Sequence, residues 1–171
     1  MEERILEGGG EFPLPAAEQI IGALARTFQP ESALLVSPRP ARMAAALRAA
    51  APKAALCVLT GGSGAIRALQ EGDPDRLILE EGSPEEVLGR RSEPADFMVL
   101  DGRTPNAAGL IPLLFAALSE GGFWAVWGET SPEWEKIREA LSDHPGLICE
   151  TLEAGVILCM KKRPTRTIST Q

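Results

Sequence analysis

The feature that most constrains the fold is a regular alternation of short apolar runs with amphipathic stretches along most of the chain. The apolar runs predict strands at 33–36, 55–59, 77–79, 97–100 and 123–127. Helical spacing of apolar residues, or high helix propensity, predicts helices at 15–28, 41–51, 65–70, 84–88, 106–119 and 131–142. Repeated strand–helix units of this kind predict a mostly parallel sheet with helices on both faces.

Three prolines refine the helix boundaries. Ser83 before Pro84 and Ser131 before Pro132 are expected N-caps, because Ser accepts a free backbone N–H and Pro needs none at the first helical position. Pro112 lies inside the stretch 106–119, so the regular part of that helix is expected to start only near Leu110.

The last two apolar runs break the alternation. Residues 147–152 and 156–160 are separated only by Glu153-Ala154-Gly155, which is too short for a crossover helix. They therefore predict an antiparallel hairpin that inserts one reversed strand into the sheet. The fold class is α/β, with a seven-stranded, mostly parallel sheet. A chain of 171 residues suits one domain, predicted at 13–162, with a flexible leader at 1–12 and a flexible tail at 163–171.

Composition narrows the classes of partner. The 24 acidic residues outnumber the 17 basic ones, and the net charge of −7 disfavours nucleic acid and anionic membranes. No apolar stretch reaches the roughly 18 residues that span a bilayer. The odd number of cysteines, each inside an apolar run, favours reduced thiols and a cytoplasmic location. Trp124 and Trp127 are expected on opposite faces of their strand, either in the core or in the contact of a homodimer.

Two residue types set limits on chemistry. The chain has one His, which leaves no His cluster for a metal, and no metal site is predicted. That residue, His144, follows a helix at the end of the sheet away from the strands' carboxyl ends. The chain also has no Tyr, so mechanisms that use a tyrosine acid or base are excluded.

The order of elements, with several short motifs, resembles the class I S-adenosylmethionine-dependent methyltransferases, and within them the small-molecule O-methyltransferases. The resemblance covers about residues 11–161 and rests on the stretch from Arg76 to Ser83, on Asp96-Phe-Met-Val-Leu-Asp101, and on Gly121-Gly122 before the fifth strand. It implies a Rossmann-like methyltransferase fold, S-adenosylmethionine as a possible cofactor and a small-molecule substrate.

The positions that would hold the cofactor depart from the family pattern. The acidic, glycine-rich loop after the first strand is replaced by Ser37-Pro38-Arg39-Pro40, and the acid after the second strand by Thr60-Gly61-Gly62. An Asp expected after the third strand is Ser83, preceded by Gly82. The resemblance therefore implies a degenerate cofactor site, whose candidate binding residues are Ser37, Arg39, Thr60, Gly61, Gly62, Gly82, Ser83 and Arg103.

Asp101 is the candidate catalytic residue, because it is a carboxylate at the end of a central strand, where open α/β sheets bind ligands. The alternative is that it caps the turn 102–105. Arg39 and Arg103 are placed to grip an anion above the sheet, or to pair with Asp101 and Glu129.

The loop Thr60–Gly64 offers a competing interpretation. A glycine-rich loop between a strand and a helix can hold phosphate on its free N–H groups. The loop also resembles that of short-chain dehydrogenases, but their catalytic acid is a Tyr, which is missing here. Three hypotheses follow: a methyltransferase-like protein with a degenerate and catalytically weakened site, a non-catalytic interaction or scaffold homodimer, or a binder of another nucleotide or anion through Thr60–Gly64.

Overall fold

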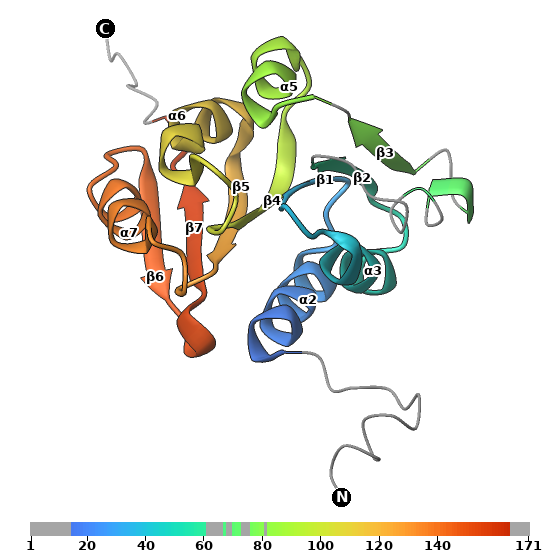
Figure 1. The fold of residues 1–171 in the computed structure, drawn as a ribbon, viewed down its shortest axis with the longest axis horizontal. Coiled ribbons are helices and arrows are strands. Elements are labelled where there is room, and N and C mark those ends of the chain that lie inside the picture. The colour runs from blue at the N-terminus through green and yellow to red at the C-terminus, as the bar shows by residue number, and fades with distance from the viewer. Residues whose placement is uncertain (1–14, 61–66, 68–69, 73–75, 81, 165–171) are drawn as a thin grey trace, which may run out of the picture.

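The computed structural model describes residues 15–60, 67, 70–72, 76–80 and 82–164. They form a seven-stranded sheet in the order β3-β2-β1-β4-β5-β7-β6 (Figure 1). The strands are β1 (Ser32–Val36), β2 (Ala55–Leu59), β3 (Leu77–Glu80), β4 (Ala95–Asp101), β5 (Leu118–Trp127), β6 (Leu147–Thr151) and β7 (Ile157–Lys161). The pairs among β1 to β5 are parallel, and β7 is antiparallel to both β5 and β6. The predicted sheet and its reversed strand are confirmed.

Helices cover both faces of this sheet. Residues of α2 (Ala16–Phe28) and α3 (Ala41–Ala50) pack into one apolar cluster. Residues of α5 (Pro84–Arg90), α6 (Ala107–Ala117) and α7 (Trp134–Ser142) pack into the other (Figure 1). Trp124 and Trp127 belong to opposite clusters, as strand alternation predicts.

The start of α6 differs from the prediction. The helix begins at Ala107 rather than near Leu110 and contains Pro112 in its interior. The N–H groups of Ala107 and Ala108 in its first turn donate to the carboxylate of Glu133 at 3.2 and 3.4 Å, and that of Ala107 also donates to the Thr104 carbonyl at 3.1 Å. This distant cap stabilises the first turn, which the sequence around Pro112 does not reveal.

The structure also differs from the prediction at the C-terminal end of α6 and at the start of α7. The chain enters β5 at Leu118, five residues before the predicted start, because Leu118 pairs with Ala95 across an irregularity in the β4–β5 ladder. The helix predicted from Ser131 begins at Trp134. The Ser131 hydroxyl caps a preceding turn instead, accepting the N–H of Glu133 at 3.1 Å.

Several expectations fall wholly or partly outside the described residues. These are the leader 1–12, most of the tail 163–171, the loop 61–64 and most of the helix expected at 65–70. The division into domain, leader and tail therefore stays a prediction. No helix in the described part of the chain has the length and apolar character needed to cross a membrane.

Candidate functional site

The carboxyl ends of three neighbouring strands are level with one another. Val36 at the end of β1 pairs with Leu59 of β2 on one side and with Leu100 of β4 on the other. The residues that follow the paired positions are therefore neighbours at one edge of the sheet. They are Ser37, Thr60 and Asp101, and all three are buried.

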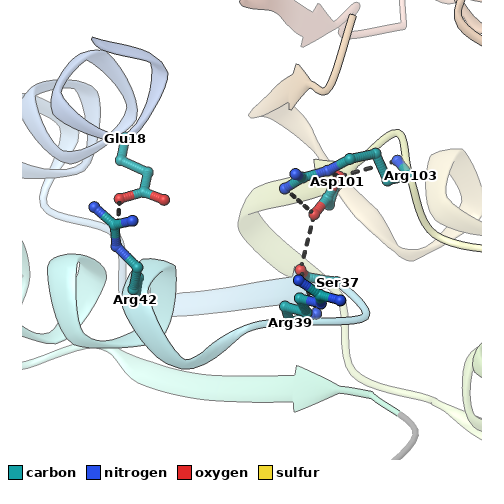
Figure 2. Close-up of polar contacts among 6 residues, drawn as sticks. All are labelled: Glu18, Ser37, Arg39, Arg42, Asp101 and Arg103. Carbon is teal, nitrogen blue, oxygen red and sulfur yellow. Dashed lines mark hydrogen bonds and ion pairs between the residues drawn. The ribbon is translucent and has the colours of Figure 1, made fainter. Parts of the chain in front are cut away.

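Asp101 is fully engaged by this chain's own donors. Its Oδ1 accepts the backbone N–H and the Nε of Arg103, both at 2.9 Å. Its Oδ2 accepts Nη2 of Arg103 at 2.9 Å and the hydroxyl of Ser37 at 3.0 Å (Figure 2). A carboxylate offers about four acceptor positions, and all four are used here. The predicted turn cap and the predicted Arg103 pair are both present, and the two roles coexist.

The ion pair is built asymmetrically. Asp101 is fully buried, whereas the Arg103 side chain is half exposed. The hydrogen bonds that Arg103 donates to the Asp101 carboxylate raise the pKa of Arg103 above its usual value. The pair therefore neutralises the buried carboxylate while half of the Arg103 side chain stays exposed.

A cavity of about 580 Å³ lies on one side of Asp101. We call it the threonine cavity, after Thr60 and Thr104, and its wall also includes Ser37, Gly82, Ser83 and Asn106. The side-chain hydroxyls of both threonines are buried and have no hydrogen-bond partner among the described residues. Such hydroxyls cost about 1–3 kcal/mol each when unpaired, so they favour a ligand or solvent partner in this space.

The far wall of the threonine cavity is the start of α5. The Ser83 hydroxyl accepts the N–H of Glu86 at 3.2 Å, which confirms its predicted role as an N-cap. Gly82 has a φ of +119°, in the region that favours glycine. Glu85 accepts the side-chain N–H of Asn106 at 3.2 Å. Its own backbone N–H, followed by the Asn106 amide, lowers the pKa of Glu85.

A second cavity, of about 430 Å³, lies on the other side of Asp101. We call it the arginine cavity, and its wall includes Glu18, Arg39, Arg42, Arg103, Trp127 and Glu129. The two cavities have no lining residue in common. Asp101 lies between them, since it binds Ser37 of one and Arg103 of the other.

The candidate residues therefore divide into two groups. The structure places Ser37, Thr60, Gly82 and Ser83 around the threonine cavity. It places Arg39 and Arg103 in the arginine cavity, while Gly61 and Gly62 lie outside the described residues.

Sequence reasoning missed three residues. Glu18 and Arg42 face each other across α2 and α3, with Glu18 Oε2 3.5 Å from Arg42 Nε (Figure 2). Arg42 follows Arg39 by three residues at the start of a helix, which is a weak signal for a shared surface. Glu18 carries no such signal, because only the packing of α2 against α3 brings it to the arginine cavity. Thr104 lies in the turn that follows the end of β4, and this position at a strand end is the signal that could have selected it.

The structure gives other motif residues structural roles. Asp96, at the start of β4, accepts the backbone N–H groups of Glu31 and Ser32, both at 3.0 Å, and so ties β1 to β4. His144 is half-buried, its ring packs on Phe115 and its Nδ1 accepts the N–H of Gly146. Among the described residues, no group of three or more His, Cys, Asp or Glu side chains could hold a metal ion.

Comparisons with known proteins find similar folds among solved structures but no related sequence. No family model and no curated protein sequence matches the chain. An SAH-bound methyltransferase of Podospora anserina is 20% identical, with a TM-score of 0.72 over 89% of this chain and 80% of that one. An O-methyltransferase of Bacillus cereus in complex with SAH is 14% identical, with a TM-score of 0.68 over 94% and 90% of the two chains. An O-methyltransferase of Streptomyces achromogenes involved in tomaymycin synthesis, in complex with SAM, is 16% identical, with a TM-score of 0.69 over 90% and 82%.

These likenesses concern the fold, since every identity is at or below 20%. They cover most of each chain. The chain therefore has the fold of the class I S-adenosylmethionine-dependent O-methyltransferases.

Proposed function

We propose that this chain is a methyltransferase-like protein that binds the nucleoside part of S-adenosylmethionine-type ligands in the threonine cavity. Its site for the reacting sulfonium is degenerate, and efficient methyl transfer is lost. The observation that carries the proposal is the complete engagement of Asp101 by Arg103 and Ser37.

The threonine cavity supports a nucleoside ligand. Its volume lies within the range of roughly 300–1,000 Å³ of small-molecule sites. The unpartnered hydroxyls of Thr60 and Thr104 match the hydroxyls and ring nitrogens of a nucleoside. Thr60 also stands at the end of β2, where the family resemblance implies an acidic residue on the ribose. A hydroxyl can make one of those hydrogen bonds but not the charge-assisted pair that a carboxylate makes.

The cationic centre of S-adenosylmethionine fits less well. A sulfonium is stabilised by nearby negative charge, and the buried carboxylate at this sheet edge is Asp101, which Arg103 neutralises. Arg39 adds a further positive charge beside Ser37 (Figure 2). The residues of the threonine cavity therefore fit the nucleoside, whereas Asp101, paired with Arg103, does not fit the sulfonium or the role of a base.

Calorimetric titration with S-adenosylmethionine and S-adenosylhomocysteine tests this. The two ligands share the nucleoside, but only the first carries the sulfonium charge. We expect the homocysteine ligand to bind at least about fivefold more tightly, a difference of roughly 1 kcal/mol. Arg103→Gln leaves the negative charge of Asp101 unpaired and should reduce the ratio of the two ligands' affinities. Arg138→Gln removes an equal charge from an exposed position on α7, where Arg138 pairs with Glu135, and should leave the ratio unchanged.

Two outcomes would contradict the proposal. One is that neither ligand binds. The other is that S-adenosylmethionine binds as tightly as S-adenosylhomocysteine and that its methyl group is transferred to a catechol or carboxylate acceptor.

A non-catalytic homodimer is the second candidate. Arg103 pairs with Asp101, which leaves this carboxylate without a free charge for catalysis. Ile148 is 53% exposed on β6, which forms one edge of the sheet. An exposed apolar side chain on an edge strand favours association. Light scattering after size-exclusion chromatography tests it, and Ile148→Lys should shift a dimer to a monomer. The alternative site at Thr60–Gly64 stays a prediction, since most of that loop lies outside the described residues.

A further inference from the structure

The arginine cavity brings together three guanidinium groups from separate parts of the chain. Arg39 comes from the loop after β1, Arg42 from the first turn of α3 and Arg103 from the loop after β4. Trp127, 8% exposed, provides an apolar wall. In a chain with a net charge of −7, this grouping of positive side chains around one cavity is specific to the folded protein.

The three arginines are not equally engaged. Arg103 uses Nε and Nη2 for Asp101, and Arg42 has its Nε 3.5 Å from Glu18. Arg39 donates its backbone N–H to the Ser37 hydroxyl, but its guanidinium has no acceptor among the described residues. Arg39 therefore carries the unpaired positive charge among the described residues of this cavity, and Arg42 and Arg103 line the same cavity.

The carboxylates in the same cavity limit the charge of a ligand. Glu18 is largely buried, and its Oε2 makes no hydrogen bond within the described part of the chain. The 3.5 Å to Arg42 is too long for a strong one. The Glu129 carboxylate lies against Gly155, with Oε2 2.7 Å from where a Cβ on that glycine would stand. Two carboxylates beside one unpaired guanidinium favour a single negative charge over a double one.

We propose that the arginine cavity binds a small molecule bearing one carboxylate, together with a hydroxyl or amine. Arg39 binds the carboxylate with help from the outer N–H groups of Arg42 and Arg103, since guanidinium forks match carboxylate geometry. The hydroxyl or amine donates to Glu18, whose Oε2 lacks a donor. An apolar body between the two polar groups packs against Trp127. This goes beyond the proposed function, because the two cavities share no lining residue.

Matched probes test the carboxylate. Calorimetry compares para-hydroxybenzoate with para-hydroxybenzamide, which has nearly the same shape and no charge. We expect the acid to bind with a Kd near or below about 1 mM and at least tenfold more tightly than the amide. Inorganic phosphate at pH 8, mostly a dianion, is expected to bind more weakly than the acid.

Three variants test the residues. Arg39→Gln should weaken binding of para-hydroxybenzoate at least fivefold. Arg138→Gln, the same change on α7, should not alter that affinity. Glu18→Gln should strengthen binding of benzoate, which has no hydroxyl to donate, because it removes a negative charge and frees Arg42. A gain of affinity is a result that simple disruption of the fold does not produce.

Four results would overturn the proposal: no binding of the acid at about 1 mM, equal affinity for acid and amide, no effect of Arg39→Gln, or competition between the acid and S-adenosylhomocysteine. The last would place the acid in the threonine cavity. Failure of S-adenosylhomocysteine to bind would contradict the proposed function alone, since the acid is titrated without it.

Discussion

Asp101 and Arg103 form a two-pronged ion pair at the end of β4, with Nε and Nη2 of the arginine each 2.9 Å from a carboxylate oxygen. The carboxylate is fully buried and the arginine half exposed. Asp101 connects Ser37 of the threonine cavity with Arg103 of the arginine cavity. The ion pair removes the free charge that a catalytic carboxylate needs.

Replacing Arg103 by Gln should destabilise the fold by about 1–3 kcal/mol, because Asp101 loses two charge-assisted bonds while remaining buried. Urea denaturation measures this. Adding Asp101→Asn removes the charge that is left behind, so the double variant should be more stable than the sum of the single changes. Strict additivity would show that the two residues do not interact energetically.

Thr60→Val should separate stability from binding. The valine keeps the shape of the side chain and removes a buried hydroxyl with no described partner, so stability should stay unchanged or rise by up to about 1 kcal/mol. Affinity for S-adenosylhomocysteine should fall roughly threefold to tenfold, the worth of one hydrogen bond. Thr27→Val serves as control, since Thr27 is exposed on α2 and its hydroxyl donates to the Ala23 carbonyl. Unchanged affinity in Thr60→Val would remove Thr60 from the ligand site.

Gly128→Ala should destabilise the fold around Asp101. Gly128 has a φ of +108°, and a Cβ there would lie 3.0 Å from the backbone N of Gly102 and 3.1 Å from Asp101 Oδ1. We expect a loss of about 2 kcal/mol or more. Gly22→Ala, in the middle of α2 with nothing within 4 Å of the added Cβ, should instead stabilise by about 0.5–1 kcal/mol. Thermal unfolding of both variants checks the contrast, and equal effects would show that Gly128 is not constrained.

Stability should fall at alkaline pH. Burial raises the pKa of Cys57 from about 9 to about 11. The unfolded chain therefore releases this proton first, and the native state binds more protons between those pH values. The Cys57 proton therefore contributes about 2–3 kcal/mol to the free energy of unfolding below about pH 9. This contribution is lost as the pH rises to about 11. Cys57→Val should flatten the slope of unfolding free energy against pH in that window. An unchanged slope would assign it to other groups, among them Cys159, whose pKa is also raised.

Cys149 should be the first of these three thiols to be alkylated. It is half-buried, and the hydrogen bond from Cys159 lowers its pKa, so it forms the reactive thiolate more readily. Cys57 and Cys159 are buried. Brief treatment with iodoacetamide at pH 8, followed by peptide mass spectrometry, gives the order. Faster modification of Cys57 would contradict it.

The fold was largely predictable because its signals are local. The order of strands and helices follows from apolar periodicity between near neighbours, and the short spacer Glu153–Gly155 gave the reversed strand. The boundaries that differ have distant causes. Glu133 caps α6 across 26 residues, and Ala95 draws Leu118 into β5.

By itself, the sequence determined the strand–helix order, the opposite placement of Trp124 and Trp127, and the position of Asp101 at a strand end. Only the tertiary structure decided how Asp101 is used. Its contact with Ser37 joins residues 64 apart, and the pairing of β1 with β4 brings them together. Local periodicity sets which face a residue takes, but the order and register of the strands set which side chains meet.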